Sequence, residues 1–78
     1  MSIIVYSAPG CSTCELVKNF LTDKGYTFEV RDLLSNREYQ KEVEALGMMG
    51  IPVTVVNGKA VKGFDAAALN KLLEDSAT

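Results

Sequence analysis

Residues 8–15, APGCSTCE, stand between an apolar run at 3–6 and a run of helical spacing that extends to Lys24. The two thiols, Cys11 and Cys14, are therefore expected at the junction between a strand and a helix. Residues three apart lie on one face of a helix, and the resulting Cα separation of roughly 5 to 6 Å is one that a disulfide tolerates. We expect this pair to open and close a disulfide with little movement of the backbone.

The position of the two thiols on the helix distinguishes them. Cys11 is expected at the helix N-terminus, where unpaired N–H groups and the helix dipole favour a negative charge, and Cys14 one turn inside. Helix N-termini lower the pKa of a cysteine thiol, so Cys11 is predicted to be the nucleophile. Ser12 and Thr13 offer hydroxyl and backbone N–H donors to its thiolate, and Pro9-Gly10 keeps Cys11 out of the preceding strand and its sulfur accessible.

Two other uses of a Cys-x-x-Cys motif compete with redox chemistry. A structural zinc site needs four ligands, and the chain has two cysteines and no histidine, which excludes a closed zinc site within one chain. A purely structural disulfide that closes so short a loop would stabilise the fold little. Redox function is the favoured interpretation, with intermolecular metal or cluster binding and structural roles as the alternatives.

Length and composition bound the remaining possibilities. Seventy-eight residues, 47% hydrophobic and 23% charged, predict one globular domain over residues 1–78. The net charge of −2 and the absence of a basic cluster argue against nucleic acid as a partner. No apolar run approaches the roughly 18 to 20 residues of a membrane span, and the first residues lack the pattern of a secretory signal. We therefore expect a cytoplasmic protein, in which a close cysteine pair rests mostly as the dithiol.

The first half of the chain predicts a right-handed βαβ unit with parallel strands. A strand is expected at 3–6, a helix from Ser12 to Lys24 with Gly25 just past its last turn, and a second strand at 26–31. A second helix then begins with a capping box of Ser35 and Glu38, and ends near residue 45 or 46. The charged residues of this helix, Glu42 included, are expected to form its solvent face.

The second half predicts a hairpin and a last helix. Asn57-Gly58 separates two β-branched runs, 53–56 and 59–62, which is the signature of a two-residue antiparallel turn. A helix is expected over 66–74 with Asp65 as its N-cap, followed by a frayed tail at 76–78. The element order is βαβ, then αββα.

The Cys-x-x-Cys at the first helix, Ile51-Pro52 before the third strand and Gly63-x-Asp65 before the last helix together resemble the glutaredoxin family of the thioredoxin superfamily. Within it, the chain is most similar to NrdH-type redoxins and related small glutaredoxin-like proteins. The resemblance implies an α/β minimal thioredoxin fold, a four-stranded mixed sheet flanked by three helices. It also implies thiol-disulfide exchange, with Cys11 as nucleophile, Cys14 as resolving thiol, and a cis peptide bond at Pro52.

The resemblance also assigns a binding surface and partners. The residues expected to contact partners are Pro9, Gly10, Ser12, Thr13, Ile51, Pro52, Gly63, Phe64 and Asp65, with no metal site and no bound cofactor besides the Cys11-Cys14 disulfide. The implied partners are a thioredoxin-reductase-type flavoprotein as reductant and a disulfide-bearing protein such as ribonucleotide reductase, and we expect a monomer.

Departures from the sequence pattern of glutathione-using glutaredoxins favour the thioredoxin-reductase-type flavoprotein as reductant. Glutathione users carry a basic residue where this chain has Ala8, Thr-Val-Pro where it has Gly50-Ile51-Pro52, and a second glycine where it has Phe64. Glutathione has two carboxylates that need charge-assisted partners, although Arg37 or Lys62 would compensate in part. A glutathione-dependent glutaredoxin, including one that acts through Cys11 alone, and a protein that binds glutathione or an iron-sulfur cluster are the alternatives.

Overall fold

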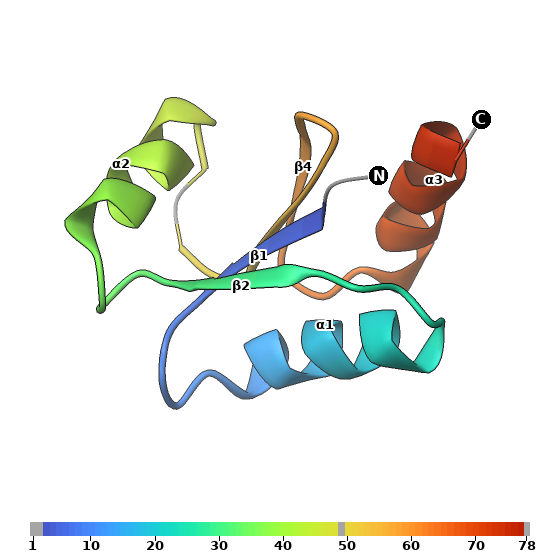
Figure 1. The fold of residues 1–78 in the computed structure, drawn as a ribbon, viewed down its shortest axis with the longest axis horizontal. Helices are drawn as coiled ribbons and strands as arrows, with labels where there is room; N and C mark the ends of the chain where they lie inside the picture. Colours follow the sequence, from blue (N-terminus) through green and yellow to red (C-terminus); the bar gives the residue numbers. More distant parts are fainter. Residues whose placement is uncertain (1–2, 49, 78) are drawn as a thin grey trace.

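The computed structural model describes residues 3–48 and 50–77. Its elements are β1 (Ile3–Ser7), α1 (Ser12–Asp23), β2 (Glu29–Asp32), α2 (Arg37–Ala45), β3 (Val53–Val56), β4 (Lys59–Lys62) and α3 (Ala66–Ala77). The strands form one mixed sheet in the order β2-β1-β3-β4, in which β1 runs parallel to β2 and antiparallel to β3. This arrangement confirms the predicted α/β architecture, and Figure 1 shows α1 and α2 on opposite sides of the sheet.

Buried side chains fill both faces of the sheet. On one face, residues of α1 and α3 pack against β1 and β3; on the other, α2 packs against the same two strands. The buried members of the first cluster are Ile3, Val5, Val17, Leu21, Val56, Leu69, Leu72 and Leu73, and those of the second are Tyr6, Val43 and Val53. The central strands β1 and β3 therefore connect the two halves of the core, and β1 leads directly into the cysteine motif.

The end of α1 explains why the second strand starts later than predicted. Gly25 has a φ of 82°, and the N–H groups of Gly25 and Tyr26 donate to the carbonyls of Thr22 and Leu21. This pattern closes the helix with a left-handed glycine and uses the N–H of the following residue. Tyr26 therefore belongs to the helix end, and the strand expected at 26–31 begins only at Glu29.

The cap predicted for the second helix was wrong. Asn36, not Ser35, is the N-cap: its side chain accepts a hydrogen bond of 2.9 Å from the N–H of Glu38. The Ser35 hydroxyl instead donates to the carbonyl of Asp32. Ser and Asn are both good N-caps, and here the turn that follows β2 engages the serine and leaves the asparagine to begin the helix.

The C-terminal half matches the predicted hairpin and helix, with one difference. Asn57 and Gly58 both have positive φ, 50° and 87°, as a type I′ turn requires. The Asp65 carboxylate accepts a hydrogen bond from the N–H of Ala68, as an N-cap does. The helix continues to Ala77 where a frayed tail was expected from residue 76, because nothing in that segment breaks a helix; Thr78 lies outside the described residues.

A polar cluster connects α2 to the sheet. It includes Glu42, which we expected on the solvent face of the helix. The Tyr6 hydroxyl and the Arg31 Nη1 both donate to the Glu42 carboxylate, at 2.7 and 2.6 Å. Arg31 also pairs with Glu29, and its guanidinium lies over the rings of Tyr6 and Tyr39. We call Tyr6, Arg31 and Glu42 the α2 clamp, because they join β1, β2 and α2.

The clamp shifts the pKa of each of its members. Burial, then the hydrogen bond to Glu42, raises the pKa of Tyr6. The hydrogen bond from Tyr6, followed by Arg31, lowers the pKa of Glu42, and the hydrogen bond to Glu29, with those to Glu42 and Tyr6, raises that of Arg31. Because the pKa of Glu42 is lower in the folded chain than its usual value of 4.5, its stabilising effect is present above that value and is lost as the pH falls through the folded pKa.

Removing the Tyr6 hydroxyl tests the clamp. We expect Tyr6→Phe to lower the free energy of unfolding by about 0.5 to 1.5 kcal/mol at neutral pH, the usual worth of such a hydrogen bond. The loss should shrink at an acidic pH low enough to protonate the Glu42 carboxylate, whose pKa is lowered in the folded chain. Urea unfolding at the two pH values measures it, with Tyr26→Phe as the matched control, and an equal loss in Tyr26→Phe would contradict the assignment.

Candidate active site

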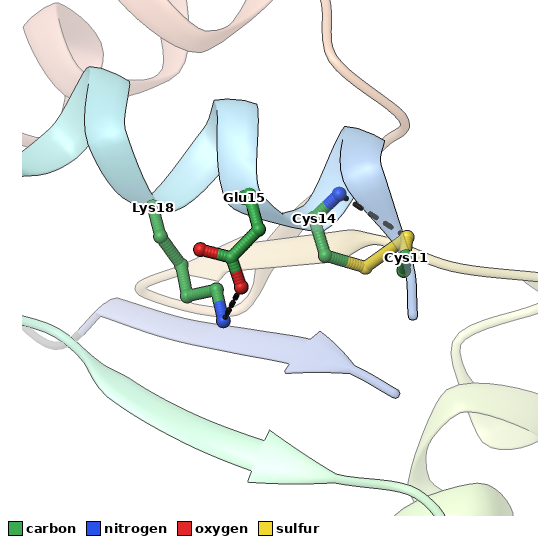
Figure 2. The surroundings of a disulfide bond; sticks show 4 residues. All are labelled: Cys11, Cys14, Glu15 and Lys18. Carbon is green, nitrogen blue, oxygen red and sulfur yellow. Dashed lines mark hydrogen bonds and ion pairs between the residues drawn. A yellow bond between two sulfur atoms is a disulfide. The ribbon is translucent and has the colours of Figure 1, made fainter. Parts of the chain in front are cut away.

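The two sulfurs lie where β1 has ended and α1 begins. Cys11 is the N-cap of α1, with extended backbone angles, and its sulfur accepts a hydrogen bond of 3.1 Å from the N–H of Cys14. The two cysteines form a disulfide, and their Cα atoms are 5.2 Å apart (Figure 2). The predicted position of Cys11 at the helix N-terminus is thus confirmed, and a helix donor points at its sulfur.

Burial separates the two thiols. Cys11 is partly exposed, whereas Cys14 is 1% exposed and faces the sheet beside the buried residues of α1. An incoming disulfide therefore has access to the Cys11 sulfur and not to that of Cys14. This difference in access, together with the helix N-terminus, gives the two cysteines unequal chemistry.

Groove 1 opens beside Cys11 and has a volume of about 430 Å³. Its wall includes the predicted partner-binding residues Pro9, Gly10 and Ser12 together with Ala8. Gly10 has a φ of 79°, a conformation that favours glycine and turns the chain from the strand toward the helix. Ser7, Glu15, Lys18, Val30 and Asp32 complete the lining.

The charged residues of groove 1 were not predicted to take part in the site. Lys18 Nζ lies 2.7 Å from the Glu15 carboxylate (Figure 2). Both residues line the groove, together with Asp32. Lys18 pairs with its helix neighbour and lies along the wall of groove 1. With one lysine against two carboxylates, this side of Cys11 is acidic.

Groove 2, about 360 Å³, meets groove 1 at Ala8, which lines both. Gly50 and Ile51 form part of its wall, and the peptide bond between Ile51 and Pro52 is cis. Pro52 is buried next to Val53, the β3 residue opposite Tyr6. The remaining lining residues are Leu33, Leu34, Gln40, Val43, Glu44 and Met48, so groove 2 is the more apolar of the two.

The Gly-Phe-Asp segment adjoins Pro52. The N–H of Gly63 donates to the carbonyl of Pro52 at 2.7 Å, which fixes the end of β4 there. Phe64 is 40% exposed, and its ring packs edge-to-face on Phe20 of α1, with centroids 5.8 Å apart. Asp65 caps α3, and the side chain of Thr13 is partly exposed in the first turn of α1.

Neither a metal-binding cluster nor a membrane-spanning helix is present in residues 3–48 and 50–77. No three or more Cys, His, Asp or Glu side chains gather there in a way that would hold a metal ion. None of the helices in those ranges has the length and apolar character needed to cross a membrane.

Comparison with known proteins agrees with this geometry. The glutaredoxin family model matches residues 3–61, which include the cysteine pair, Pro52 and the hairpin turn. The chain belongs to the glutaredoxin family. Since this family uses a Cys-x-x-Cys pair held at disulfide distance, the protein is a dithiol-disulfide oxidoreductase whose redox centre is Cys11–Cys14.

Several known proteins are similar to this chain over nearly its whole length. The Gene 56 protein of Mycobacterium phage L5 is 35% identical over 92% of this chain and 72% of its own length. The glutaredoxin-like protein NrdH of Lactococcus lactis is 29% identical over 90% of this chain and 97% of its own. The structure of NrdH-redoxin from Escherichia coli, described as having a thioredoxin-like activity profile, superposes with a TM-score of 0.85 at 25% identity, over 92% of this chain and 95% of that one.

Proposed function

We propose that this glutaredoxin-family protein reduces disulfides in proteins and is itself recycled by a thioredoxin-reductase-type flavoprotein, as an NrdH-type redoxin would be. The observation that carries the proposal is the asymmetry of the pair: Cys11 is accessible and accepts the N–H of Cys14, while Cys14 is buried. A dithiol arranged in this way attacks a partner with one sulfur and releases it with the other.

The chemistry follows from that asymmetry. In the dithiol form, the Cys11 thiolate attacks one sulfur of the partner disulfide, and the other partner sulfur leaves as a thiol. Cys14 then loses its proton and attacks the Cys11 sulfur, which releases the second partner thiol and leaves Cys11–Cys14 oxidised. The partner gains two electrons and two protons. A reductase must restore the dithiol by the reverse exchange.

The surroundings of Cys11 support a protein as the partner. Grooves 1 and 2 meet at Ala8, and together they offer an extended surface that includes the reactive sulfur in groove 1. Pro9, Gly10, Ser12 and Ile51 lie on these walls, and we assign them to partner contact. We assign a supporting role for the same surface to Pro52, Gly63, Phe64 and Asp65. Thr13 is assigned as a donor beside the sulfur.

Ribonucleotide reductase is the proposed electron acceptor, by similarity to the NrdH proteins, and the cytoplasm the proposed compartment. The test is a coupled assay in which NADPH, a thioredoxin-reductase-type flavoprotein and this protein supply electrons to a ribonucleotide reductase. We expect deoxyribonucleotide formation at a rate that rises with the concentration of this protein. Rapid reduction of insulin without any support of the reductase would restrict the function to other protein disulfides.

A further inference from the structure

Lys62 lies beside the partner surface, although the exchange chemistry gives it no role. It is the last residue of β4 and pairs with Val53 of β3. A Cβ atom built on Gly50 would lie 3.6 Å from its Cε and 3.9 Å from its Nζ. The lysine side chain therefore lies against the loop at Gly50, next to Ile51, where both residues form the wall of groove 2.

The backbone holds this lysine in place. The next residue, Gly63, donates its N–H to the carbonyl of Pro52 at 2.7 Å, so the end of β4 is fixed to the residue that follows Ile51. Because the strand end is fixed, the ammonium group stays within reach of anything that docks along Gly50 and Ile51.

The charge of Lys62 has no counter-ion in the described part of the chain. The ion pairs found there engage Lys18, Arg31 and Lys41, and Lys24 lies over the ring of Phe20. Lys62 makes no ion pair or side-chain hydrogen bond with the residues at 3–48 and 50–77. An exposed ammonium beside a binding surface is thus available to a carboxylate on a partner.

The charges around the cysteines are distributed unequally. The strand order β2-β1-β3-β4 places Asp32, at the end of β2, and Lys62, at the end of β4, on opposite edges of the sheet. The register joins Asp32 to Ser7, Tyr6 to Val53 and Val53 to Lys62, so both charges lie at the same end of the strands. That end is acidic on the side of groove 1. On the side of groove 2, Lys62 lies against Gly50, and Glu44 is the one acidic residue in the lining that the described residues provide.

We propose that Lys62 selects partners: among disulfide-bearing polypeptides, it favours those with a carboxylate side chain next to the reactive cysteine. The inference rests on the proposed function, whose substrate class it specifies. Charges at the rim of an interface act mainly on encounter and orientation, so the acidic side chain would lie toward Lys62 and away from groove 1. The determinant belongs to the polypeptide partner and not to glutathione.

The experiment uses three peptides of one sequence, each linked as a dimer through a single cysteine that is flanked by Glu, Gln or Lys. The ratio of kcat/KM for the Glu peptide to that for the Gln peptide is measured for the unmodified protein and its variants. We expect Lys62→Met to lower this ratio by up to about fivefold, the range for exposed charge pairs, and Lys62→Glu to lower it further, because it replaces the attraction by a repulsion. High salt should remove the difference.

Lys59→Glu is the matched control. It makes the same charge change on the same strand, but Lys59 pairs with Val56 at the end of β4 far from Gly50. The inference predicts an unchanged ratio in this variant. An equal fall in Lys59→Glu would show a general effect of net charge and would overturn the proposal.

The other outcomes are equally decisive. An unchanged ratio in Lys62→Glu, with normal reduction of the Gln peptide by the unmodified protein, overturns the role of Lys62 and leaves the proposed function standing. A response only when the Gln peptide is offered as its mixed disulfide with glutathione would assign the lysine to the tripeptide and also overturn the inference. Failure of the unmodified protein to reduce any of the peptides counts against both.

Discussion

Replacing Cys11 by serine should abolish the reduction of protein disulfides, with a loss of at least about a thousandfold in the insulin assay, because removing a nucleophile removes the reaction path itself. Cys11 is the accessible sulfur and the N-cap of α1, and the buried Cys14 cannot take its place. Cys14→Ser should instead retain the first attack and accumulate a mixed disulfide between Cys11 and the partner.

Thermal unfolding is the control for this pair of variants, because it shows whether each one is folded. Neither variant can form the disulfide, so the thermal midpoint of each is compared with that of the reduced unmodified protein. Cys11→Ser should match it, because serine is a good N-cap. A Cys11→Ser variant that still reduced insulin at a substantial rate would remove Cys11 from the role of nucleophile.

The second large effect concerns the reductant: a thioredoxin-reductase-type flavoprotein should recycle this protein at least about tenfold faster than glutathione does. Ala8 lines both grooves and offers no charge where glutathione users carry a basic residue. Each charge-assisted hydrogen bond that is missing is worth roughly 1.5 to 3 kcal/mol, or about one to two orders of magnitude in affinity.

Phe64 contributes to the same preference. It stands where glutathione users have glycine, and its half-exposed ring is held by Phe20, so it adds apolar area next to Gly63. Apolar area of this kind favours a protein surface over a charged tripeptide. The ring contact places the apolar patch of Phe64 and Phe20 along α1.

Turnover of one disulfide substrate with each reductant, at matched concentration, tests the preference. We expect Ala8→Lys to raise the rate supported by glutathione about tenfold, while Asn19→Lys, the same charge on an exposed position of α1, leaves it unchanged. If glutathione and its reductase give the faster rate with the unmodified protein, this is a conventional glutaredoxin.

Those parts of the fold that depend on local chemistry could be read from the sequence. The handover from β1 to α1 at the cysteines, the Asn57-Gly58 turn and the Asp65 cap all depend on a few neighbouring residues, and all are present in the structure. Where two local signals competed, prediction failed. Asn36 rather than Ser35 caps α2, and Tyr26 completes α1 rather than opening β2.

The rest could not be read because it depends on contacts between distant segments. Tyr6, Arg31 and Glu42 belong to three elements. Only the register of β1 with β2 and the packing of α2 against the sheet bring them together. A tyrosine in an otherwise apolar buried strand was the one available signal, since a buried hydroxyl needs a partner. Likewise, Lys62 meets Gly50 only because β4 folds back on β3 beside the loop before Pro52.

The order in which the two thiols of the reduced protein are alkylated tests most directly whether Cys11 is the nucleophile. Iodoacetamide is added at about pH 6 and quenched at intervals, and mass spectrometry of the digested protein locates the label. Because a thiolate reacts and a thiol does not, we expect Cys11 to be labelled at least about tenfold faster than Cys14. Faster labelling of Cys14 would contradict this expectation and reverse the roles of the two cysteines.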